Sequence, residues 1–314
     1  MRALWQLMKE TWNGISNDKI PRLAASLAYY TVFSMGPLLV VIISLCGLFL
    51  KREAIEGKIY SMLQDFVGND TAIQLQDIIR HASLSGKSTI AIIIGAIALF
   101  VGATSVFSQI QDAINSIWGL KPKPGKNLIK LLRNRFLSFS VIISLGFLLL
   151  VSLAFSAIIE SLSNRLKIHY ADASVILFYI INLVLTFGIC LLIFAVIFKV
   201  LPDAVIRWKD VLTGAIVTSV LFIIGKFAIS FYVSQTKVGS TYGAAGSLVI
   251  LLVWIYYSSI ILYTGAEFTK AYAIKYGAEI KPNDYAVTTE IIEKEKGSQS
   301  IQKKESLQKK NNSG

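Results

Sequence analysis

Six apolar stretches, each long enough to cross a lipid bilayer as a helix, are the feature that most restricts how this chain can fold. A hydrocarbon core about 30 Å thick needs about 20 apolar residues in an α-helix. The stretches cover residues 23–50, 90–117, 136–159, 174–200, 211–233 and 244–272. They lack the alternation of barrel strands. The sequence therefore predicts an all-α integral membrane protein, with a six-transmembrane-helix bundle over residues 23–280.

The low fraction of charged residues agrees with a membrane location, but the strongly positive net charge needs an explanation. Only 16% of the 314 residues are charged, against about 25% in soluble domains, yet the net charge is +12. If the expected loops are assigned to alternate sides, 22 of the 31 Lys and Arg residues share the side of both termini and 8 lie on the other. Positive residues favour the cytoplasmic side, so both termini are expected in the cytoplasm. The excess of positive charge then serves to orient the protein in the membrane, and nucleic acid is not an expected partner.

Three segments outside the spans have patterns of their own. Residues 1–22 form an amphipathic cytoplasmic segment, in which Leu4, Met8, Trp12 and Ile15 follow helical spacing. This N-terminal helix suits the membrane interface and equally suits packing at the foot of the bundle. Residues 51–89 predict two short amphipathic external helices. Residues 281–314, rich in Lys, Glu, Gln and Ser, predict a disordered basic cytoplasmic tail.

Polar residues within membrane spans are costly and therefore informative. Seven of them fall in the expected cytoplasmic half of spans one, two and six, where a polar cavity would accommodate them; hydrogen bonding between helices is the alternative. These candidates are Tyr29, Tyr30, Gln109, Asp112, Asn115, Tyr263 and Glu267. Pro37 lies inside span one and predicts a helix kink there.

The loop after span two carries six basic residues and no acidic residue, which makes it a candidate contact for anionic lipid headgroups. Its members are Lys121, Lys123, Lys126, Lys130, Arg133 and Arg135. Orientation alone is the other interpretation of this loop. The two histidines, His81 and His169, fall in expected external loops, and no hydrolase, metal-ligand or ATP-binding pattern occurs. We expect no catalytic residues, no metal, no cofactor and no enzyme activity.

Several segments also resemble a known family. The segment RLAASLAYYT, which begins at Arg22, resembles the first-span signature of the YihY/BrkB family. Asn115–Trp118, Leu201–Asp203 with Trp208, and the segment from Tyr242 to Glu267 are similar to later motifs of that family. The resemblance covers roughly residues 1–280 in order. It implies a bacterial inner-membrane protein with six spans and poorly defined activity, for which virulence, ribonuclease and lipid-transport roles have been suggested.

Three functions follow from these patterns. The first is transport or flipping of an amphiphilic anionic envelope lipid or a related solute. The second is a non-transporting envelope scaffold or regulatory factor, and the third and weakest is a membrane-bound ribonuclease. Membrane lipids are the expected partners. Small residues at helical spacing, such as Gly214 and Thr218, favour close helix packing and leave a homo-oligomer open.

Overall fold

The computed structural model describes residues 2–46, 89–122, 171–235, 246–277, 280–283 and 286–288. The described helices are α1 (Arg2–Asn17), α2 (Ile20–Cys46), α5 (Thr89–Ile117), α7 (Ala171–Val200), α8 (Trp208–Gln235) and α10 (Gly246–Tyr276). The described strands are β1 (Leu120–Pro122), β2 (Ala204–Val205), β3 (Lys281–Pro282) and β4 (Ala286–Thr288).

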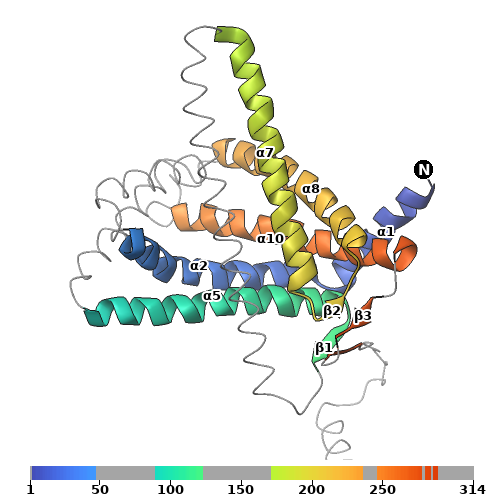
Figure 1. The fold of residues 1–314 in the computed structure, drawn as a ribbon, viewed down its shortest axis with the longest axis horizontal. Coiled ribbons are helices and arrows are strands. Elements are labelled where there is room, and N and C mark those ends of the chain that lie inside the picture. Colours follow the sequence, from blue (N-terminus) through green and yellow to red (C-terminus); the bar gives the residue numbers. More distant parts are fainter. Residues whose placement is uncertain are drawn as a thin grey trace, which may run out of the picture.

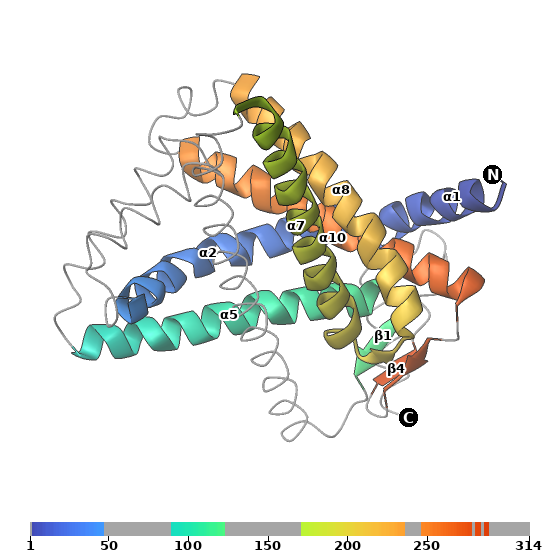
Figure 2. The ribbon, with the colours of Figure 1, turned by 45° about the horizontal axis from the view of Figure 1, so that its top comes forward.

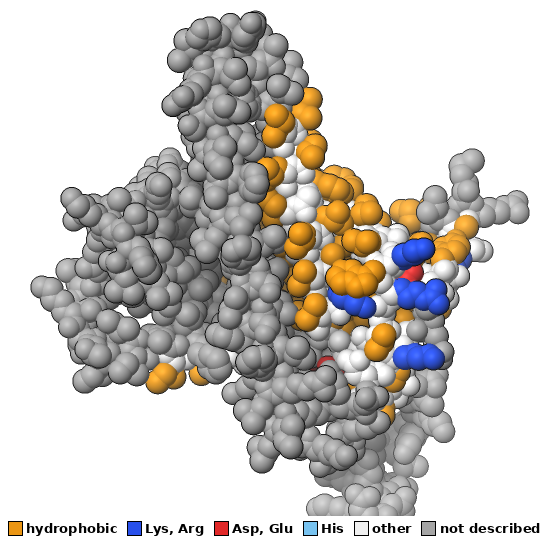
Figure 3. Space-filling model, in the orientation of Figure 1, with side chains coloured by type: hydrophobic (Ala, Val, Ile, Leu, Met, Phe, Trp, Pro, Cys, Tyr) orange, Lys and Arg blue, Asp and Glu red, His pale blue; other side chains and the backbone are white. Residues whose placement is uncertain are grey.

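Five long helices lie where the first, second, fourth, fifth and sixth apolar stretches were expected. Within the described residues, segments of α7, α8 and α10 are long and apolar enough to cross a membrane. Helices α7 and α8 expose apolar side chains such as Val184, Ile224 and Phe227, as lipid-facing helices require. Figure 3 shows hydrophobic side chains along this face of the molecule. The expected third span (136–159) and the two external helices (51–89) lie outside the described residues.

The helices pack in an order that differs from their order in the chain. Helix α5 lies along α2, α2 along α10, α10 along α8, and α8 along α7 (Figures 1 and 2). The buried core is concentrated toward the ends of the helices that lie near the strands, around side chains such as Ile114, Phe198 and Tyr263. Helices that are distant in sequence, such as α2 and α10, are therefore brought side by side by packing in this core.

Two small antiparallel ladders join the ends of distant helices. Strand β1 pairs with β4, with Leu120 opposite Thr288, and β2 pairs with β3, with Ala204 opposite Pro282. The sequence interpretation placed residues 281–314 in a disordered tail, whereas in the structure Lys281–Pro282 and Ala286–Thr288 form β3 and β4, and Ala286 is buried. The expectation failed for these residues because the two short strands are ordered by backbone pairing to segments after α5 and α7, which composition does not reveal. Residues 289–314 lie outside the described residues.

The N-terminal helix α1 is confirmed as a helix, and it ends two residues before a sharp change in backbone direction. Lys19 adopts a positive φ of 53° between α1 and α2. Pro21 lies in the first turn of α2, where a missing N–H leaves no helical hydrogen bond unmade. Helix α2 continues past Pro37 to Cys46, and the kink at Pro37 stays a prediction.

A reciprocal contact between glycine and threonine joins α8 to α10. Thr218 donates a hydrogen bond to the Gly214 carbonyl of its own helix at 2.7 Å, and Thr269 does the same to Gly265. A Cβ atom on Gly214 would overlap the Thr269 hydroxyl, and one on Gly265 would overlap the Thr218 hydroxyl. The two helices therefore approach closely at two points along their contact, as small-residue faces allow.

Candidate functional site

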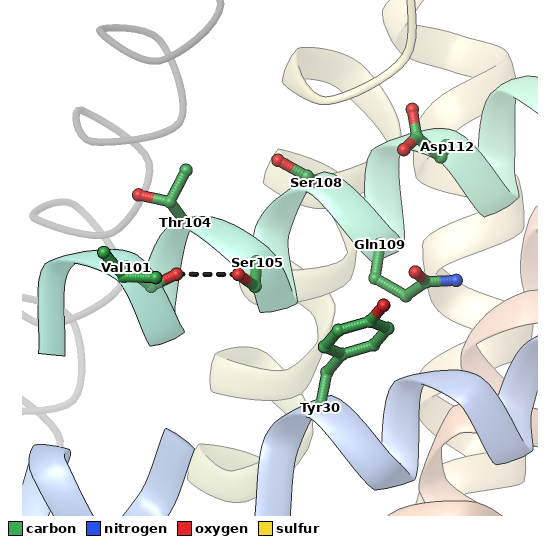
Figure 4. A pocket seen from close by; sticks show the side chains of 7 residues that line it. All are labelled: Tyr30, Val101, Thr104, Ser105, Ser108, Gln109 and Asp112. Carbon is green, nitrogen blue, oxygen red and sulfur yellow. Dashed lines mark hydrogen bonds between the residues drawn. The ribbon is translucent and has the colours of Figure 1, made fainter. Parts of the chain in front are cut away.

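A polar pocket of about 310 Å³ opens between α2 and α5. Six of its lining positions lie on one face of α5, because they follow one another at intervals of three and four residues or share a turn. The lining side chains are Tyr30, Val101, Thr104, Ser105, Ser108, Gln109 and Asp112 (Figure 4). The helical period of α5 thus gathers hydroxyl, amide and carboxyl groups in a helix that is otherwise strongly apolar.

The pocket presents a carboxyl group together with hydroxyl and amide groups. Ser105 donates its hydroxyl hydrogen to the Val101 carbonyl at 2.8 Å, which leaves the oxygen lone pairs available. Asp112 brings a carboxyl group to one end of the row, and the Tyr30 side chain rises from α2 toward Gln109 (Figure 4). The seven lining residues include no Lys, Arg or His. The arrangement suits a ligand that supplies hydrogen-bond donors.

Three of the seven predicted cavity residues line this pocket: Tyr30, Gln109 and Asp112. Tyr29 is next to them in sequence, but its side chain is exposed and its ring lies 4.6 Å from that of Phe33. The remaining three predicted residues lie elsewhere.

Asn115 belongs to a buried polar cluster around Asp203, not to the pocket. The Asp203 backbone N–H donates to Asn115 Oδ1 at 2.9 Å, and Asn115 Nδ2 donates to Asp203 Oδ2 at 3.0 Å. Gln111 Nε2 donates to the second carboxylate oxygen at 3.1 Å. Gln109 and Asn115 lie on different faces of α5, because six residues turn a helix by about 240°. Gln111 and Asn115, four residues apart, do share a face.

Glu267 lies at the contact between α10 and α1. Its side chain is buried, and Lys270 lies 3.4 Å from its Oε1 atom and 3.3 Å from Asp18 Oδ2. A Cβ atom on Gly14 would overlap the Glu267 carboxylate, so α1 passes directly over it. Tyr263, one turn earlier, is fully buried, and its hydroxyl has no hydrogen-bond partner in the structure. The pocket described above has neither residue in its lining.

Lys121 is the described member of the predicted basic set. It lies in β1, opposite Val287, and its side chain is exposed. The other five basic residues, at positions 123, 126, 130, 133 and 135, lie outside the described residues.

Sequence reasoning missed several interactions at the ends of the helices. Gln111 and Asp203 were not among the predicted site residues, and neither was Trp118, whose indole N–H donates to the Ala266 carbonyl at 3.1 Å. The family motifs contain Asp203 and Trp118, but sequence spacing does not name their partners, which lie 88 and 148 positions away. Within the described part of the chain, no group of three or more His, Cys, Asp or Glu residues is placed to hold a metal ion.

Comparison with known proteins gives consistent matches. A family model described as "Virulence factor BrkB" matches residues 11–288. A UPF0761 membrane protein of Vibrio vulnificus is 29% identical over 272 residues, which cover 82% of this chain and 79% of the relative. One from Aeromonas salmonicida is 27% identical, covering 82% and 86%, and one from Pseudoalteromonas atlantica is 25% identical, covering 86% and 87%. No solved structure matches.

Proposed function

The chain belongs to the BrkB virulence-factor family of membrane proteins, and from that premise we propose that it transports or flips an amphiphilic envelope lipid, or a related solute, across the bacterial inner membrane. In this proposal the protein has six spans, with residues 136–159 as the third, and both termini lie in the cytoplasm. The proposal assigns the chain no catalytic step.

The pocket between α2 and α5 is the observation that carries the proposal. Polar groups in membrane helices are costly unless they face protein or a polar cavity, and α5 gathers five of them, from Thr104 to Asp112, on one face. Exposed apolar side chains lie close by on the same two helices, at Phe33, Ile97 and Val101. A polar headgroup in the pocket with acyl chains along this apolar surface is the arrangement that a lipid transporter requires.

The distribution of charge suggests how an anionic lipid would be held. The pocket lining has one carboxyl group and no cation, so a phosphate group is disfavoured inside it. The basic segment from Lys121 to Arg135 follows α5 by only a few residues, and such segments attract anionic lipid surfaces. We assign the phosphate to this basic segment and the hydrogen-bond donors of the headgroup to the pocket.

A lipid-scrambling assay in proteoliposomes tests the proposal. Fluorescent lipid analogues of each native headgroup class are exposed to an impermeant quencher, and protein-dependent loss of inner-leaflet signal reports transfer. Ser108→Phe fills the pocket and is expected to reduce transfer at least tenfold, whereas Ser116→Phe, at an exposed position of the same helix outside the pocket lining, is the matched control. The proposal is overturned if wild-type protein transfers no lipid class, or if both variants transfer equally well. Metal-dependent RNA cleavage by the purified protein would instead support the ribonuclease alternative.

A further inference from the structure

Helix α1 has one face that is packed against the protein. Leu7 and Thr11 are buried, and Gly14 lies against Glu267 of α10. These positions are four and three residues apart, so they form one stripe along the helix. Lys275 of α10 adds polar contacts to the flank of this stripe, with its Nζ 3.1 Å from Gln6 Oε1 and 3.7 Å from Glu10 Oε1.

A second apolar face of α1 is exposed, and none of the described residues covers it. The exposed fractions of Trp5, Met8 and Trp12 are 71%, 63% and 72%. These three residues are also spaced by three and four, so they form a separate stripe, rotated by about 125° around the helix axis from the Leu7 stripe. The contacts with α10 fix the rotation of α1 about its axis, and therefore fix the direction in which the two indole rings point.

We propose that α1 lies in the membrane interface on the side of the N-terminus, with Trp5, Met8 and Trp12 inserted at the boundary between lipid headgroups and acyl chains. Indole rings favour this boundary because one edge is apolar and the N–H edge stays hydrated. The basic side chains nearby are arranged for an anionic lipid surface: Lys9 is exposed beside the apolar stripe, and Lys19 and Arg22 are exposed at the junction with α2.

The position of α1 in the fold supports a lipid interface, and not a soluble partner, as the cover of this apolar face. Helix α2, which coincides with the first expected span, begins three residues after α1 ends, so the C-terminal end of α1 lies close to where the chain would enter the bilayer. Figure 1 shows α1 leaving the line of α2 at this junction. Lys and Arg side chains gather at the end of the molecule where α1 and the last turns of α10 lie (Figure 3).

Site-directed spin labelling of the full-length protein in nanodiscs tests the proposal. Met8→Cys and Asn13→Cys are labelled one at a time with a nitroxide, in a background with Cys46 and Cys190 replaced by serine. Asn13 is exposed but five residues from Met8, on the polar side of the helix, and serves as the matched control. The accessibility of each label to oxygen and to a water-soluble nickel chelate is measured in nanodiscs of phosphatidylcholine, with and without phosphatidylglycerol.

The expected result is a label at Met8 that collides several-fold more often with oxygen than with the nickel chelate, and a label at Asn13 with the opposite preference. Phosphatidylglycerol is expected to move the Met8 label deeper into the bilayer, which raises its oxygen accessibility relative to nickel. The Lys9→Gln substitution is expected to reduce that effect. Equal nickel accessibility at the two positions would overturn the proposal. Dipolar broadening between Met8 labels would also overturn it, because that result shows a second copy of the chain on this face.

Discussion

Removing the Asn115 side chain should destabilise the protein strongly, because Asn115 satisfies a buried carboxylate from another segment. Asn115 and Asp203 are each 4% exposed, and they share two hydrogen bonds of 2.9 and 3.0 Å. In Asn115→Ala, the carboxylate keeps Gln111 as its side-chain partner, and the Asp203 N–H loses its acceptor. A hydrogen bond to a charged group contributes about 1.5–3 kcal/mol and one between neutral groups about 1 kcal/mol. We therefore expect a loss of about 3 kcal/mol in the free energy of unfolding.

Equilibrium unfolding of the purified protein in mixed detergent micelles measures this loss. Ser116→Ala, at the exposed neighbouring position on α5, is the control and should change stability by less than about 0.5 kcal/mol. The double variant Asn115→Ala with Asp203→Ala should be more stable than the sum of the single losses predicts, with a coupling of at least about 1.5 kcal/mol. If Asn115→Ala is as stable as the control, or if the two losses simply add, the pair does not act as the structure indicates.

Three further predictions concern the contacts between helices. Gly265→Val should cost about 1–3 kcal/mol or more, because its side chain would displace Thr218; unchanged unfolding would contradict the close approach of α8 and α10. Trp118→Phe should cost about 1 kcal/mol in the same assay through loss of the bond to the Ala266 carbonyl, and a neutral effect would argue against that bond. Lys275→Ala should leave global stability within about 0.5 kcal/mol, since its ion pair is partly exposed, but should speed limited proteolysis within α1; equal cleavage rates would show that Lys275 does not hold α1.

The helices of this fold could be predicted from sequence because burial in lipid requires long, continuous apolar runs. The end of α5 at Ile117 and that of α7 at Val200 match the expected limits of their spans. The strands could not be predicted in the same way. Strands β2 and β3 contain two residues each, too few for any periodicity, and their order comes from backbone pairing across the chain.

In the candidate site, too, sequence periodicity predicts some residues, whereas others depend on contacts between distant segments. The three predicted residues that line the pocket come from the expected first and second spans, and two of them share a face of α5, which sequence periodicity can identify. Helical rotation also places Asn115 on a face of α5 other than the pocket face. That Asp203 is its partner could not be predicted, because the position of Asp203 depends on the path of the chain after α7. Glu267 was recognised as a polar residue within a span, but its contact with Gly14 depends on how α1 folds back onto α10.

The reciprocal glycine and threonine contact between α8 and α10 determines which parts of the molecule can move relative to one another. At these two points only a threonine side chain separates the backbones, so little there can change rotamer to absorb a sliding motion, and we expect the two helices to move together. A transport cycle that exposes a site first to one leaflet and then to the other needs a hinge or a rocking boundary. Under the proposed transport function, we expect that boundary to lie outside the α8–α10 pair.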